Sequence, residues 1–170
     1  MKNEMINKKK FDYSWVIVIL CVLTLFVALA FCSWTKGLFL KPITEFLDIE
    51  RSAFSINDTI RYVATTIVYL FFGVLVKKFG AKALLLTGII ALIGSMSLYA
   101  IADSIFVFYI GGFLLGVGVA FSSTTMMGYI INKWVKRNKG TIMGIVFASN
   151  GIGGAFASPI VSSFIAKSIL

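Results

Sequence analysis

The stretch GVLVKKFGAKALLLTGIIALIGSMSLYAIAD, residues 73–103, decides the fold of this chain. It opens with a short basic segment, in which three lysines surround Gly80, and continues with 20 uncharged residues from Ala83 to Ala102. About 20 consecutive apolar residues are what an α-helix needs to cross a bilayer. No segment of the chain alternates apolar and polar residues with the period of two expected of a membrane strand. The stretch therefore predicts a basic loop followed by a transmembrane helix.

The composition of the whole chain agrees with this interpretation. Of its 170 residues 59% are hydrophobic and only 14% are charged, and the mean hydropathy is +0.95. Soluble domains are nearer half apolar and a quarter charged. The composition excludes a disordered chain and a disulfide scaffold. The net charge of +9 is typical of cations beside membrane spans rather than of a nucleic-acid-binding module. We conclude that this is an all-α integral membrane protein.

The requirement for about 20 consecutive apolar residues also locates further spans. A chain of this length has room for about five spans with short loops, or six if they are tightly packed. The first apolar run follows three lysines, but it is longer than a signal-peptide core and lacks a clear cleavage site, so we expect it to be retained. We expect a tail at residues 1–14 and a transmembrane domain at 15–170, with spans at about 15–40, 52–76, 83–102, 105–131 and 141–166.

The loop charges predict the orientation. Eleven of the 16 cations lie in the tail, the second-to-third loop and the fourth-to-fifth loop, all on one side of the membrane. On the other side Lys36, Lys41 and Arg51 are offset by three acids, and the third-to-fourth turn carries only Asp103. Positive loops stay in the cytoplasm. We therefore expect a cytoplasmic N-terminus in the cell membrane.

Small residues recur at helical spacing in the later spans. Gly112 and Gly116 form one G-xxx-G pair, and Gly140 and Gly144 form another. Such pairs let helix backbones approach closely, and we favour simple packing over helices that slide during transport. Pro159 is expected to bend the last span, because it removes a backbone donor.

The two cysteines, Cys21 and Cys32, lie in one apolar run. If that run is helical they stand about 16 Å apart. This is too far for a disulfide.

Few residues suit catalysis. The chain has no histidine, and its seven acids lie mostly in loops. A Ser-His-Asp triad and a His-ligated metal are therefore excluded, and we expect no enzymatic activity, no metal and no cofactor. The polar run Ser122–Thr125 has no base nearby, so a polar patch lining a helix is the favoured interpretation over a nucleophile.

The spacing of glycines and lysines in the basic loop is also informative. Its pattern, from Gly73 through Lys77 and Lys78 to Gly80 and Lys82, resembles the cytoplasmic loop signature of the major facilitator superfamily. In that signature an acid, which helps to lock the outward-open state, stands where this chain has Lys77. The resemblance implies the N-terminal bundle of a transporter in which two six-helix bundles rock around a midplane site.

Other segments resemble one branch of that superfamily, the oxalate/formate antiporters and monocarboxylate transporters. These segments are WTKGLFLKPITEF at 34–46, RSAFS at 51–55 and NKWVKRNKG at 132–140. The resemblance implies that Lys41 handles a substrate carboxylate, whereas the alternative is an interfacial lysine that reaches water.

Arg61 is the candidate cation within a span. A charge at that depth is usually functional, although Asp58 three residues earlier could pair with it near the outer surface. Trp34 and Asn150 are further candidates for the substrate path, along with Tyr62 and Tyr69, although aromatic residues in membranes more often serve packing.

We therefore expect secondary active transport of a small organic anion, such as a mono- or dicarboxylate, by alternating access. The expected partners are the lipid bilayer, the anion and a missing C-terminal bundle, with no nucleic acid, so the chain would be a fragment of a larger carrier. The alternative is a truncated, non-transporting membrane protein, or a helical subunit that packs on a partner.

The orientation generates the first testable prediction. Single cysteines introduced at Asp103 and at Lys136 should differ in reactivity toward a membrane-impermeant maleimide added outside intact cells, with only position 103 labelled. Labelling of position 136 instead would overturn the charge argument.

Overall fold

The computed structural model describes residues 13–29, 37, 44, 50–135 and 138–168. Every secondary-structure element within these residues is a helix, which confirms the predicted fold class. Among these residues, three helical stretches, Ser52–Ala100, Ile105–Trp134 and Lys139–Ser163, are long and apolar enough to cross a membrane. Trp15–Leu29 is a shorter apolar helix. The helices are α1 (Tyr13–Leu25), α3 (Arg51–Ala100), α4 (Ile105–Phe121), α5 (Thr124–Trp134) and α6 (Lys139–Ser168).

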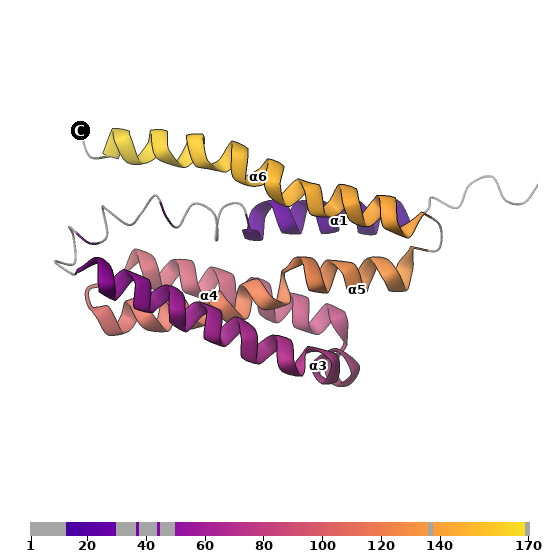
Figure 1. Cartoon of the computed structure of the whole chain (residues 1–170), viewed down its shortest axis with the longest axis horizontal. Coiled ribbons are helices and arrows are strands. Elements are labelled where there is room, and N and C mark those ends of the chain that lie inside the picture. The colour runs from indigo at the N-terminus through magenta and orange to yellow at the C-terminus, as the bar shows by residue number, and fades with distance from the viewer. Residues whose placement is uncertain (1–12, 30–36, 38–43, 45–49, 136–137, 169–170) are drawn as a thin grey trace, which may run out of the picture.

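Helix α3 contains two arms joined at Gly80. This glycine has φ 78° and ψ 153°, whereas the residues on both sides are helical. That conformation is essentially restricted to glycine, so the turn depends on residue 80. Gly73 lies inside the first arm, and a Cβ added there would meet nothing within 4 Å. Figure 1 shows the chain reversing at this turn, so α3 supplies two passes.

A second break separates α4 from α5. Ser122 leaves the helical conformation, and Ser123 is extended, with φ −81° and ψ 175°. Both serines are buried, and the Ser123 hydroxyl donates a hydrogen bond to the Ala120 carbonyl at 2.9 Å. The run that the sequence indicated as a polar patch therefore includes the junction of two helices.

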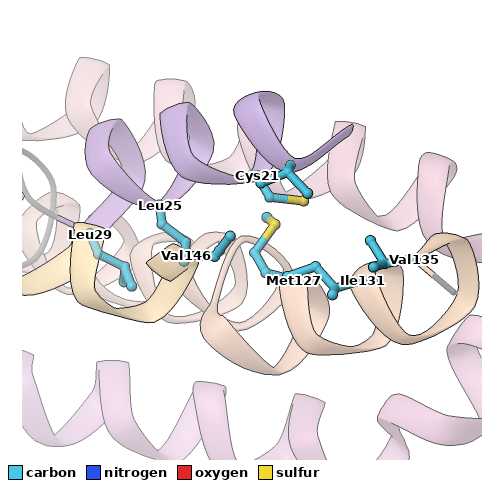
Figure 2. Close-up of a cluster of buried hydrophobic side chains, with 8 residues drawn as sticks. Cys21, Leu25, Leu29, Met127, Ile131, Val135 and Val146 are labelled. Atoms are coloured by element: carbon cyan, nitrogen blue, oxygen red, sulfur yellow. The ribbon is translucent and has the colours of Figure 1, made fainter. Parts of the chain in front are cut away.

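The helices form two groups linked by α5. Both arms of α3 run beside α4, while α1 lies beside α6 (Figure 1). Helix α5 contacts both groups, and within the described residues α1 makes no close backbone contact with α3. Figure 2 shows how α5 joins the group formed by α1 and α6. Met127 and Ile131 of α5 pack in one cluster with Cys21 and Leu25 of α1 and with Val146 of α6.

The first glycine pair mediates the α3–α4 contact. A Cβ added at Gly116 would collide with the Arg61 carbonyl and would come within 2.9 Å of Ala64, and one added at Gly112 would meet the Asn57 amide at 2.7 Å. These distances leave no room for a side chain. The backbones of α3 and α4 are therefore in close contact at Gly112 and Gly116.

The second glycine pair behaves differently. A Cβ at Gly140 or Gly144 would meet nothing within 4 Å. Their spacing thus mediates no helix contact in the described part of the chain. Pro159 lies inside α6, which continues as a helix through it. Cys21 is a buried free thiol, and Cys32 lies outside the described residues.

The two pairs provide a matched test of the packing. We expect Gly116→Ala to destabilise the protein by about 1–3 kcal/mol, because the added methyl forces the helices apart. Gly144→Ala should be neutral or slightly stabilising, since alanine favours a helix interior. Unfolding of the purified protein in detergent, followed by circular dichroism, measures both. Equal effects would contradict the assigned interface.

Candidate anion-binding site

Arg61 is the one buried charged residue among those that the structure describes, with 8% of its surface exposed. It lies in the third turn of α3, within a stretch long and apolar enough to cross the membrane. Burying a cation in such a place is costly unless other groups compensate it. The groups around its side chain therefore decide what this residue can do.

The Arg61 guanidinium has an acidic neighbour and an aromatic one. Its Nε lies 3.5 Å from Oδ1 of Asp58, one turn earlier on the same helix, as the spacing in the sequence predicted. The Tyr62 ring lies 4.5 Å from the guanidinium carbon, within the range of a cation–π contact. About 35% of the Asp58 side chain is exposed, so the pair connects a buried cation with a more accessible carboxylate.

The backbone at Arg61 is attached to α4. The Thr65 hydroxyl lies 2.9 Å from the Arg61 carbonyl and 3.0 Å from the Gly116 carbonyl, and it is placed to donate to either. The same Arg61 carbonyl faces the Cα of Gly116, where no side chain intervenes. The α3–α4 packing thus fixes the backbone of Arg61, from which the side chain reaches its partners on α3.

One turn earlier, Asn57 joins both arms of α3 to α4. This residue is fully buried. Its Nδ2 donates a hydrogen bond to the Phe108 carbonyl at 2.5 Å, and the Tyr99 hydroxyl donates to its Oδ1 at 3.0 Å. Nearby, the Ser95 hydroxyl donates to the Gly111 carbonyl at 2.7 Å. Three helical segments therefore share one polar network beside the arginine.

This network is not apparent from the sequence alone. Asn57 is an uncharged polar residue in an apolar segment, four positions before Arg61, which places both on one face of a helix. That spacing is the signal that could have drawn attention to it. Tyr99, Ser95 and Thr65 carried no comparable signal, because their partners are backbone groups or residues distant in sequence.

Among the other predicted substrate-site residues that the structure describes, Tyr62 contacts Arg61, whereas Asn150 lies on a helix away from it. Asn150 is half-buried on α6, and α6 makes no close backbone contact with α3 in the described residues. Trp34 and Lys41 lie outside the described residues. Tyr62 and Tyr69 are exposed. The loop-signature lysines at 77, 78 and 82 are exposed around the Gly80 turn, and Gly73 is exposed in the first arm of α3.

Comparison with known proteins identifies the family. Residues 22–170 match the family model described as Major Facilitator Superfamily. The chain belongs to the major facilitator superfamily. It is therefore an integral membrane protein of a transporter family, as its loop signature suggested.

Two curated relatives are from Bacillus subtilis (strain 168). An uncharacterized MFS-type transporter, YcxA, is 26% identical over 123 residues, which cover 72% of this chain and 30% of that protein. A nitrite extrusion protein is 25% identical over 126 residues, which cover 72% of this chain and 31% of that protein. The chain thus aligns with about a third of the length of each relative. No solved structure matches it significantly.

The polar network yields a stability prediction. Asn57→Ala should lower the free energy of unfolding by about 1–3 kcal/mol, because it leaves the Phe108 carbonyl and the Tyr99 hydroxyl buried without these partners. Asn132→Ala is the matched control, since Asn132 is exposed and accepts hydrogen bonds only from the Lys139 ammonium among the contacts described for it. The same unfolding assay applies, and similar losses in both variants would contradict the network's importance.

Proposed function

We propose that this chain contributes the anion-binding part of a secondary transporter for a small planar anion, and that Arg61 binds the anion. The observation that carries the proposal is the burial of Arg61, on α3, beside a partly exposed carboxylate. A fixed cation in a low-dielectric environment attracts an anion far more strongly than a cation in water does.

The shape of the Arg61 guanidinium favours one class of substrate. Its planar fork of N–H donors matches anions that present two oxygens on one planar centre. A carboxylate has this geometry, and so does nitrite, the anion in the name of the nitrite extrusion protein. We therefore extend the expected mono- or dicarboxylate class to include nitrite-like anions.

Asp58 has a specific part in this proposal. Without substrate it compensates the charge of Arg61 at 3.5 Å. An entering anion competes with Asp58 for the guanidinium and frees the carboxylate toward its exposed side. Binding thereby exchanges one ion pair for another, so the cation need not stay buried without compensation.

The remaining parts of the proposal concern a carrier that contains this chain. Alternating access, in which helical bundles rock around a central site, is proposed for that carrier, in the cell membrane with the N-terminus inside. Lys41, which lies outside the described residues, is proposed as a second cation on the substrate path.

Anion binding by the purified chain tests the proposal. Isothermal titration in detergent with nitrite, formate, acetate and oxalate should show binding of at least one anion, with chloride as the comparison. Arg61→Gln should weaken that binding at least tenfold, and Arg61→Lys should weaken it too, because an ammonium lacks the planar fork. Lys133→Gln, which removes an exposed cation, should bind as the wild type does.

Two results would overturn the proposal. One is wild-type affinity in a folded Arg61→Gln variant. The other is the absence of binding for every anion of the panel by a folded wild-type chain. Parallel uptake into liposomes, with Lys41→Ala as a further variant, separates anion binding from complete transport: saturable uptake would argue against the alternative of a non-transporting protein.

A further inference from the structure

A long apolar groove runs between α1 and the second arm of α3. Along that arm its lining residues recur every three or four positions, from Lys82 through Leu85 and Ile89 to Met96, so they share one helix face. The opposing wall is a face of α1 that includes Leu20 and Thr24. Because α1 and α3 make no close backbone contact in the described residues, the two walls meet only through side chains, and Ala28 and Leu92 belong to one buried cluster.

The groove is made of two cavities, of about 420 and 320 Å³, that both include Thr24 in their linings. From Lys82 to Met96 it extends about 21 Å along the helix. Its lining is almost wholly apolar. The Thr24 hydroxyl donates to the Leu20 carbonyl of its own helix at 2.8 Å. The groove therefore offers an occupant dispersion and burial, with little hydrogen bonding along its length.

The one charged residue in the described lining of the groove lies at one end. Lys82 lines the cavity at that end, together with Trp134 of α5. Lys77 and Lys78 are exposed beside the Gly80 turn, and Lys133 is exposed beside Trp134. Among the acids that the structure describes, Glu50 and Asp103 lie just beyond the two ends of α3, away from the Gly80 turn, and Asp58 lies nearer to the start of α3 than to that turn. The apolar groove thus opens onto a basic surface.

We propose that this groove binds an anionic phospholipid, with an acyl chain along α1 and α3 and its phosphate at Lys82. An anionic amphiphile matches both properties of the groove, an apolar channel and a cationic mouth. Basic pockets between membrane helices are typical sites for anionic headgroups. Tryptophan favours the level of the headgroups, which is where Trp134 stands in this arrangement.

The lipid proposal does not depend on the proposed anion site, because Arg61 lines neither cavity.

Lipid titration of the purified full chain tests the proposal. Phosphatidylglycerol added to detergent micelles should raise the thermal unfolding midpoint by more than phosphatidylcholine with the same acyl chains. Native mass spectrometry should show phosphatidylglycerol bound more tightly, by about fivefold or more. Lys82→Gln should abolish this preference, Lys82→Arg should retain it, and Lys77→Gln, which removes a neighbouring charge outside the groove, should also retain it.

A groove-filling variant tests the position of the acyl chain. Thr24→Phe should reduce binding of both lipids while preserving the helical content. If Thr24→Phe does not fold, the comparison of the lysine variants still decides. Equal binding of the two lipids by the wild type, or equal losses in Lys82→Gln and Lys77→Gln, would overturn the proposal. So would a wild-type dimer that Thr24→Phe makes monomeric, because the groove would then accept a second copy.

Discussion

The close contact between α3 and α4 is the constraint on which the rest of this structure depends. In a bilayer, apolar side chains gain little by leaving the lipid, so helices associate through packing and hydrogen bonds. Here Gly112 and Gly116 remove side chains from one surface, and Asn57 and Thr65 supply hydrogen bonds from the other. The same contact holds the backbone of Arg61, so a cation can lie buried where an isolated helix would expose it to lipid.

Much of the fold could be predicted from the sequence, because membrane insertion is governed by hydropathy and length. The all-helical class followed from long uncharged runs, and the turn at Gly80 from the lysines and glycine around it. Two features could not be predicted in this way. The α4–α5 break falls at serines that a helix would tolerate, and the α6 glycines have the spacing of a contact without having one in the described residues.

The candidate site was predicted only in part. Arg61 and its pairing with Asp58 follow from one helix, so spacing along the chain was enough to propose them. The Asn57 network joins residues about 40 to 50 positions apart, and no local pattern encodes that proximity. The substrate class was suggested by resemblance alone, and the family match supports membrane transport without specifying the anion.

The central claim is that helix packing positions Arg61 for an anion. The most direct test is the anion affinity of Gly116→Ala compared with that of Gly144→Ala, each at a temperature where the protein is folded. We predict that Gly116→Ala weakens anion binding although Arg61 and Asp58 are unchanged, whereas Gly144→Ala binds as the wild type does. Undiminished affinity in Gly116→Ala would contradict this claim.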